Sequence, residues 1–271
     1  MKTKHKILIA KIVSNLITFI YKNKVLAKRN NIYWSLNLNV GIDLSMFLFG
    51  RFENSILDVA KYIIENKNID ILDIGSNMGI HSLRLAKIFK NSTIYSIEPT
   101  DFAYKKLMKN IALNHEIKNI KTFQYFITTK NIKPKKVYSS WELGNRNNKH
   151  KKHYGTLKTT RCSRVISLDK FVKENKIDKK ILIKCDVDGS ELEVFKSGKD
   201  FLKKNKPYII MELAPYLFTE FGYNVDTLLD LLKEYDYKFY ETKNYSEIKD
   251  IYKYANNIND GSSTNIFYFM I

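Results

Sequence analysis

The chain has 271 residues, of which 44% are hydrophobic, so it is long enough to bury a sizeable core. Its scarcity of glycine and proline (10 and 4 residues) argues against disorder and against a loop-rich secreted scaffold. The formal charge of +18 indicates either a polyanionic partner or a lysine-rich composition with solvated charges on every face; the even spread of the lysines favours the second. Two cysteines, Cys162 and Cys185, are too few for a disulfide framework and indicate a reducing, cytoplasmic compartment.

Residues 1–31 predict a basic amphipathic N-terminal helix, because apolar residues recur at helical spacing among lysines. The apolar positions are Leu8, Ile12, Val13, Leu16, Ile17 and Ile20. Their run is too short and too interrupted to span a bilayer. Two interpretations remain open: the helix packs on the rest of the chain or on a second subunit, or it lies peripherally on an anionic membrane. We expect residues 32–271 to form one domain, which begins with a short strand or hairpin within 32–53.

Residues 69–99 predict one strand–helix–strand unit. A buried strand at 69–74 is followed at once by a turn with the pattern DxGxNxG, and a second strand at 93–97 ends in Glu98. Glycines in such a turn let the backbone approach a ligand, and an acid at the next strand end can bind both hydroxyls of a ribose. The turn lacks the spacing of dinucleotide-binding and phosphate-binding loops. The unit therefore predicts a nucleoside-containing cofactor.

Further strands and helices alternate along the chain. We expect strands at 121–127, 181–185, 208–211, 238–241 and 265–271, and helices near 101–111, 168–174 and 225–235. Residues 128–164 are polar, basic and irregular, as in a functional loop. This alternation predicts a mostly parallel, doubly wound sheet covered on both faces. Ligands bind outside the carboxyl ends of such strands, where the chain places Asp73, Glu98, Asp186, Asp188 and Glu212.

Several motifs resemble the FkbM-type S-adenosylmethionine-dependent methyltransferases. They are Gly50-Arg51-Phe52-Glu53, the run from Asp73 to Gly79, Ile97-Glu98-Pro99, Asn110 with Asn114, Ser167-Leu168-Asp169-Lys170-Phe171, and the run from Ile183 to Glu191. The resemblance covers about residues 32–215 and implies a class I methyltransferase (Rossmann-like) fold, with a seven-stranded sheet and one antiparallel strand. It also implies O-methylation, commonly of sugar or polyketide hydroxyls. The chain departs from the family at Asp188, where glutamate is usual, and at Ile127-Thr128, where no acid follows the third strand to bind adenine.

The cofactor half of the expected site is S-adenosyl-L-methionine held by the strand–helix–strand unit. Asp73 reaches its amino group, backbone N–H groups of the turn and helix start bind its carboxylate, and Glu98 binds its ribose. The expected cofactor-binding residues are Asp73, Gly75, Ser76, Asn77, Gly79, Glu98, Pro99 and Thr128.

The acceptor half needs a group that takes a proton from a hydroxyl. Asp186 is the first candidate base, at the end of the fourth strand, and Asp188 and Glu191 lie beside it. The expected acceptor-binding residues are Glu53, Trp141, His153 and Glu212. Asp186 and Asp188 could share a divalent metal, but no third ligand follows from the sequence, so we expect none.

The leading hypothesis is an O-methyltransferase acting on a glycan or a related hydroxylated small molecule. The charge suggests a nucleic-acid methyltransferase as an alternative, but Asp186-Val187-Asp188-Gly189 stands where an Asn/Asp-Pro-Pro-aromatic motif would be needed. A non-catalytic module that binds a membrane or a protein partner through its basic N-terminal helix is the third possibility.

Overall fold

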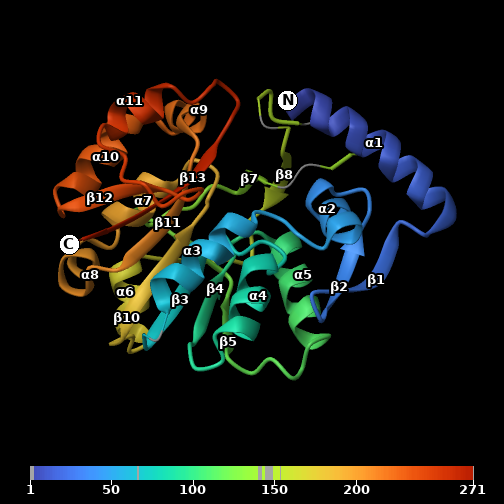
Figure 1. The fold of residues 1–271 in the computed structure, drawn as a ribbon, viewed down its shortest axis with the longest axis horizontal. Coiled ribbons are helices and arrows are strands. Elements are labelled where there is room, and N and C mark those ends of the chain that lie inside the picture. Colours follow the sequence, from blue (N-terminus) through green and yellow to red (C-terminus); the bar gives the residue numbers. More distant parts are fainter. Residues whose placement is uncertain (1–2, 66, 140–141, 144–148, 153, 271) are drawn as a thin grey trace.

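In the computed structural model, a seven-stranded sheet forms the centre of the molecule (Figure 1). The structure describes residues 3–65, 67–139, 142–143, 149–152 and 154–270. The order across the sheet is β12-β13-β11-β10-β3-β4-β5. The bounds are β3 Ile69–Ile74, β4 Ile94–Ile97, β5 Ile120–Phe123, β10 Lys180–Cys185, β11 Tyr208–Leu213, β12 Tyr237–Glu241 and β13 Thr264–Met270.

One strand of this sheet runs against the others. β13 pairs antiparallel with both β11 and β12, whereas the pairs β11–β10, β10–β3, β3–β4 and β4–β5 are parallel. Parallel neighbours need crossover connections, and helices supply them. The predicted doubly wound, mostly parallel sheet with one antiparallel strand is thus confirmed.

Helices cover both faces of the sheet, because alternate residues of each buried strand point to opposite sides. On one face, Ile71 and Leu182 pack with α3 (Asn54–Ile64) and α4 (Ile80–Ile88). On the other face, Leu72 and Ile183 pack with a larger set of helices. That set is α6 (Leu168–Glu174), α7 (Glu191–Lys196), α8 (Lys199–Asn205), α10 (Val225–Lys233) and α11 (Ile251–Asn256), while α5 (Asp101–Ala112) follows β4.

The N-terminal segment differs from the expected long helix. Helix α1 (Thr3–Ile20) ends earlier, and β1 (Lys24–Arg29) pairs antiparallel with β2 (Ile32–Asn37), before α2 (Gly41–Phe49). The expected boundary between residues 31 and 32 therefore falls inside a hairpin. Asn30 and Asn31 both have positive φ angles (53° and 58°), which is the geometry of a two-residue hairpin turn. Asn-Asn at this point is the sequence signal for the hairpin.

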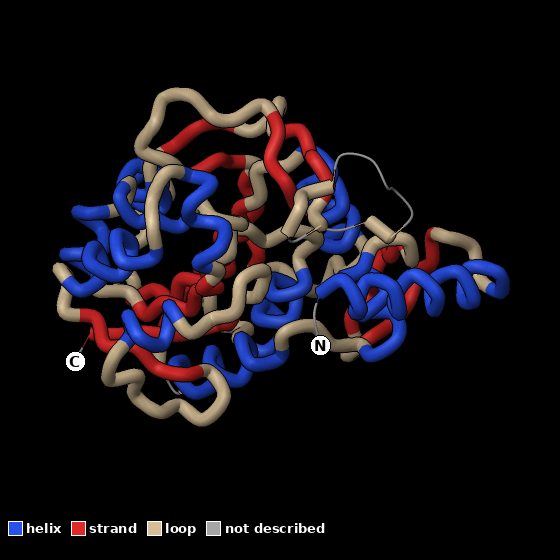
Figure 2. The backbone as a smooth tube through the Cα atoms, turned by 90° about the horizontal axis from the view of Figure 1, so that it is seen from above, coloured by secondary structure: helices blue, strands red, loops and turns tan. Residues whose placement is uncertain are grey.

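The region between β5 and α6 is more regular than expected. The chain leaves the central sheet after Phe123, and β6 (Tyr125–Ile127) pairs instead with β9 (Arg164–Ile166). A hairpin of β7 (Lys136–Ser139) and β8 (Thr156–Thr159) follows, and after β11 come α9 (Pro215–Phe218) and the 3-10 helix η1 (Thr219–Phe221). Figure 2 shows α1 projecting from one side of the molecule. Within the described residues, no helix combines the length and the apolar character needed to cross a bilayer.

Candidate active site

The carboxyl ends of four neighbouring strands lie at one edge of the sheet. In the strand register, Ile74 pairs with both Ile97 and Cys185, and Cys185 pairs with Met211. The residues that follow these positions therefore meet at this edge, as predicted. A cavity of about 580 Å³ opens there, within the usual size of small-molecule sites. Of the expected residues, those that line it are Glu53, Gly75, Ser76, Asn77, Glu98, Pro99, Asp186, Asp188 and Glu212.

The glycines of the turn are required by packing rather than by a ligand. Gly75 has φ +81°, and a Cβ atom there would lie 1.8 Å from the carbonyl oxygen of Asp186. Gly79 has φ +89°, and its Cβ would lie 2.6 Å from Cδ1 of Leu107. Asn77 has φ +49°, a left-handed conformation that asparagine tolerates. The turn is thus shaped by its fit against β10 and α5.

Most N–H donors of the turn are already used inside the protein. The N–H groups of Gly75 and Ser76 donate to the carbonyl of Ile97, at 2.9 and 3.0 Å, and that of Gly79 donates to Ser76. Asn77 donates to the Glu98 carboxylate at 2.9 Å. This corrects the expectation that these four groups bind a ligand carboxylate. Among the described residues, donors left for it are the N–H of Met78 and those of the first turn of α4, which have no intrahelical acceptors. The buried Ser76 hydroxyl also has no hydrogen-bond partner in the described chain and lines the cavity.

The Glu98 carboxylate is buried and accepts three protein hydrogen bonds. Oε1 accepts from the N–H and the hydroxyl of Thr100, at 2.8 and 2.6 Å, and Oε2 accepts from Asn77. A carboxylate has about four lone-pair sites. One acceptor position therefore remains on Oε2, enough for one hydroxyl rather than the expected two. Burial raises the pKa of Glu98, while these hydrogen bonds lower it.

Four of the expected residues lie behind the cavity wall. Asp73 is fully buried, accepts a hydrogen bond from Ser82 at 2.5 Å, and does not line the cavity. Thr128 donates to Glu193 at 3.1 Å. Glu191 accepts from the N–H of Val187 at 3.1 Å, and burial raises its pKa to about 7. Gly79 is the fourth. These residues hold the loops in place and do not face the ligand space.

Two expected acceptor residues, Trp141 and His153, lie outside the described residues.

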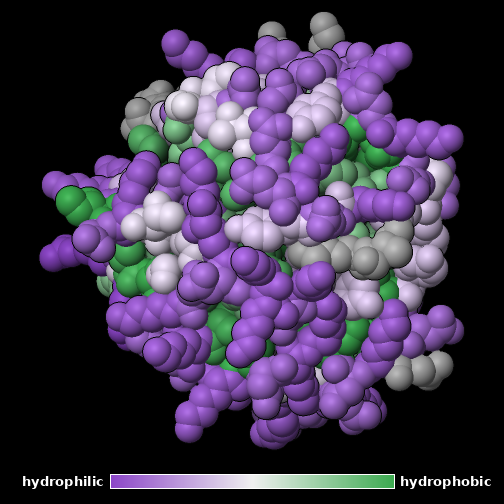
Figure 3. All heavy atoms as spheres, turned by 90° about the vertical axis from the view of Figure 1, so that its left-hand side faces the viewer, coloured by the Kyte–Doolittle hydropathy of each residue, from purple (hydrophilic) through white to green (hydrophobic). Residues whose placement is uncertain are grey.

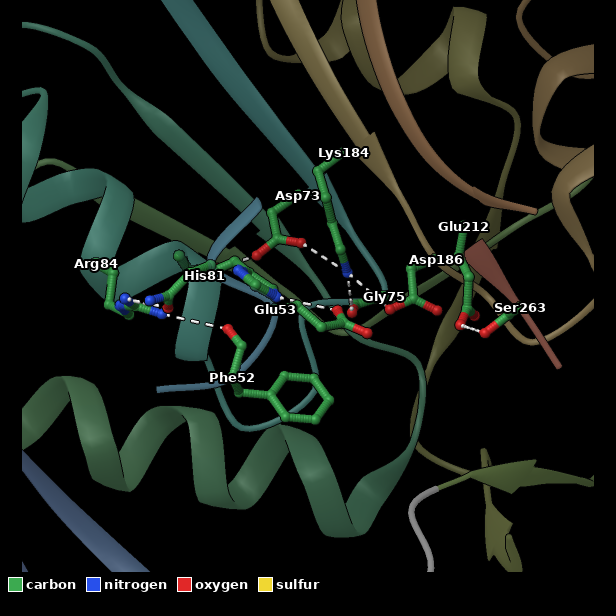
Figure 4. Close-up of polar contacts among 12 residues, drawn as sticks. Phe52, Glu53, Asp73, Gly75, His81, Arg84, Lys184, Asp186, Glu212 and Ser263 are labelled. Carbon is green, nitrogen blue, oxygen red and sulfur yellow. Dashed lines mark hydrogen bonds and ion pairs between the residues drawn. The ribbon is translucent and has the colours of Figure 1, made fainter. Parts of the chain in front are cut away.

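A buried lysine, Lys184, joins the two halves of the site. Its ammonium lies 3.4 Å from Asp73 Oδ1 and 3.3 Å from Asp186 Oδ2, and it donates to the carbonyl of Gly75 at 3.0 Å (Figure 4). A buried lysine must be paired, and here both partners are carboxylates. Sequence reasoning did not place Lys184 in the site, although a lysine inside the apolar run of residues 181–185 was its signal.

Three carboxylates gather beside Lys184 on the cavity wall. Ligand oxygens of Asp186, Asp188 and Glu212 all lie within 4.8 Å of one another, close enough to bind a divalent cation. Burial opposes ionisation of Asp186, but Lys184 and a hydrogen bond from Glu212 outweigh it and lower its pKa. Burial and the charge of Asp186 raise the pKa values of Asp188 and Glu212 well above normal. Asp186 is thus the member of the cluster that ionises most readily, and its two neighbours hold a proton to higher pH.

Glu53 faces this cluster from the segment before α3. Its Oε2 lies 3.6 Å from Nε2 of His81, and Arg84 donates to the carbonyl of Phe52 and to the side chain of Asn54 (Figure 4). Arg84 thereby fixes the segment on which Glu53 stands.

The outer wall of the cavity comes from segments that the sequence did not point to. It includes Lys136 and Tyr138 of β7, Tyr216 of α9 and Glu220 of η1. His150 Nε2 lies 2.7 Å from Glu220 Oε2, so the β7–β8 region is joined to η1 across the cavity mouth. Such contacts join residues about 70 positions apart, which no local pattern reveals.

Comparison with protein families decides the assignment. Residues 73–239, more than half of the chain, match the family model described as the Methyltransferase FkbM domain. The chain belongs to the FkbM methyltransferase family. It is therefore a methyltransferase by family, with S-adenosylmethionine as its cofactor, and the resemblance seen in its motifs is confirmed. A comparison with curated proteins gives no match.

Several solved methyltransferase structures are similar to this FkbM methyltransferase at low sequence identity. The METTL16 methyltransferase domain has a TM-score of 0.51 and 11% identity, with 96% of this chain and 79% of that chain covered. The FkbM methyltransferase from Methylobacillus flagellatus KT is 16% identical with a TM-score of 0.44; the match covers 74% of this chain but 43% of that one. TYW2 of M. jannaschii, in complex with AdoMet, is 14% identical with a TM-score of 0.40, and the match covers 91% and 84%. The METTL16 match, together with the strand order of the central sheet, confirms the class I methyltransferase fold.

Proposed function

We propose that this FkbM methyltransferase transfers the methyl group of S-adenosylmethionine to a hydroxyl of a glycan or a related small molecule. The observation that supports this best is the cluster of Asp186, Asp188 and Glu212 on the cavity wall, next to the cofactor turn. Such a cluster combines an ionised proton acceptor with groups that can hydrogen-bond neighbouring hydroxyls.

The inner wall of the cavity fits the cofactor. Glu98 Oε2 has one acceptor position for a ribose hydroxyl, and the unpartnered hydroxyl of Ser76 and the start of α4 can bind a carboxylate. Ile97, Pro99 and Ile127 offer apolar surface for an adenine ring. The bound cofactor supplies an electrophilic methyl group on a sulfonium. The protein's own contribution is alignment of the acceptor, which can lower a barrier by about 7–11 kcal/mol.

Asp186 is the proposed proton acceptor. It lines the cavity, and Lys184 at 3.3 Å keeps its carboxylate ionised at neutral pH. An ionised carboxylate within reach of a hydroxyl can take its proton as the oxygen attacks. Lys184 acts as a positioning residue, since it binds Asp186 and not the acceptor.

The charge of the acceptor wall favours a neutral, hydroxyl-rich acceptor over nucleic acid. Five acidic side chains line the cavity, against Lys136 and Lys184: Glu53, Asp186, Asp188, Glu212 and Glu220. The acidic groups outnumber the lysines even when Asp188 and Glu212, whose pKa values are raised, are left out. A phosphate backbone entering this space would meet more negative than positive groups. The excess of lysine elsewhere on the chain does not alter the charge inside the cavity.

Incubation with methyl-labelled S-adenosylmethionine and separated glycan, lipid and RNA fractions tests this proposal. We expect label in the glycan or small-molecule fraction, stable to base as an ether is. Asp186→Asn is expected to lower the rate by about 10²–10⁴-fold while cofactor affinity stays within a few-fold. Label that enters RNA alone, or an Asp186→Asn variant with full activity, would overturn it.

A further inference from the structure

Helix α1 carries two apolar faces, and the protein uses only one of them. Ala10 and Ile17 pack on the cluster around Leu38 and Leu44, and the buried hydroxyl of Ser14 donates to the carbonyl of Leu38 at 2.8 Å. These contacts account for the attachment of the helix to the domain. Packing on the rest of the chain, the first of the two interpretations of the helix, therefore explains this face of α1 only.

The opposite face of α1 is apolar and open to solvent. Ile12, Leu16, Phe19 and Ile20 are exposed by 54%, 66%, 94% and 76%. Their spacing of four, three and one residues places them on one side of the helix. Exposed apolar side chains of this size in one stripe mark an interaction surface. In Figure 1, α1 lies at the margin of the molecule, away from the central sheet.

The remainder of the surface provides a contrast. The side of the molecule away from α1, seen in Figure 3, is covered largely by hydrophilic side chains with small, separated apolar areas. Near α1, by contrast, further exposed apolar side chains belong to the neighbouring elements. They are Tyr21, Leu26 of β1, Tyr33 of β2, and Leu48 and Phe49 of α2.

The segment that carries the stripe contains basic residues and no acidic ones. Residues 1–42 contain eight lysines and arginines and no aspartate or glutamate, the first acid being Asp43. Lys22 and Lys24 follow the exposed end of the helix directly and are themselves exposed. Asp43 is buried and paired with Lys106, so it does not offset this charge at the surface.

We propose that α1 docks this enzyme on an anionic lipid surface. The apolar stripe enters the boundary between head groups and acyl chains, and the basic residues bind the lipid charges. A second copy of the chain fits less well, because each copy carries +18 and residues 1–42 contain no acid that could pair with the lysines of the other copy. The helix lies along the membrane plane in this arrangement.

Vesicle flotation with the full chain tests the proposal. We expect the protein to float with phosphatidylcholine vesicles that contain about one-third phosphatidylserine, and to stay unbound with pure phosphatidylcholine or at high salt. The double variant Leu16→Asn/Phe19→Gln should bind at least about tenfold more weakly, since two buried apolar side chains are lost. The matched control Ile132→Gln removes another exposed apolar side chain (82%) and should bind like the original.

The proposal is overturned by equal binding of the double variant and the original protein, or by failure of the folded original protein to float with anionic vesicles. It is also overturned if light scattering shows a dimer that Leu16→Asn/Phe19→Gln converts to a monomer, because the stripe would then be an interface between copies. Far-ultraviolet circular dichroism of each variant establishes that the domain is folded. None of these results depends on the proposed methyl acceptor.

Discussion

At the scale of single residues, the site is held in place by contacts between the cofactor turn and β10. The ammonium of Lys184, on β10, binds the carboxylate of Asp73 and the carbonyl of Gly75. Gly75, which has no side chain, also packs closely against the backbone just after β10. The position of Asp186 depends on all three. Changes at these residues should therefore disturb the fold of the edge before they disturb chemistry.

Gly75→Ala should be among the most destabilising single-methyl changes in the chain. It combines a left-handed backbone, about 1–2 kcal/mol, with a clash against the carbonyl of Asp186 that costs about 1–3 kcal/mol more. Gly222→Ala is the matched control, since Gly222 has the same φ of +81° with open space around it. Urea denaturation of both variants measures the difference; equal losses would refute the close approach.

Glu191 should make stability depend on pH in an unusual direction. Its pKa is raised by burial from 4.5 to about 7, so the folded state holds a proton that the unfolded state has lost between these values. Its contribution is complete below pH 4.5 and is lost as pH rises to about 7, a change of about 3 kcal/mol.

Urea denaturation across this pH range checks the effect of Glu191, as the difference in unfolding free energy between the original protein and Glu191→Gln. The original protein should lose stability relative to Glu191→Gln as pH rises. Glu193→Gln is the control of opposite sign, because hydroxyl hydrogen bonds and Lys130 lower the pKa of Glu193 despite partial burial. There the original protein should lose stability relative to the variant as pH falls. A Glu191 difference that stays constant with pH would contradict the assignment.

At the scale of elements, the sequence predicted the sheet and its functional edge but not the outer wall. Strands β3, β4, β10 and β11 are short apolar runs whose ends follow from local pattern, and parallel pairing then brings Glu98, Asp186 and Glu212 together. By contrast, the departure of the chain at Gln124 and the His150–Glu220 contact depend on distant partners. The number of free acceptors on Glu98 also follows from three-dimensional contacts alone.

The β1–β2 hairpin is predicted to depend on one asparagine of the segment after α5. The buried Asn114 side chain accepts from the N–H of Tyr33 at 2.8 Å and donates to its carbonyl at 2.7 Å. Asn114→Ala leaves both groups unpaired and should cost about 2–3 kcal/mol, with faster amide exchange in β1 and β2. Asn256→Ala, at an exposed position of α11, is the control. Unchanged exchange in the hairpin would contradict this role.

At the scale of the whole molecule, two parts of the chain differ in charge. The cavity wall is rich in acidic side chains, while residues 1–42 are basic and include the exposed apolar stripe of α1. The net charge of +18 therefore says little about the acceptor. The proposed neutral, hydroxylated acceptor suits the charge of the cavity, and the proposed anionic lipid surface suits the basic segment that includes α1.

Calorimetric titration with S-adenosylmethionine tests the central claim most directly. We predict one cofactor per chain, an affinity about 10–100-fold weaker for Glu98→Ala because a hydrogen bond to a charged group is lost, and no change for the exposed Glu234→Ala. The absence of binding to the folded protein, or equal affinities for Glu98→Ala and the original, would contradict the account.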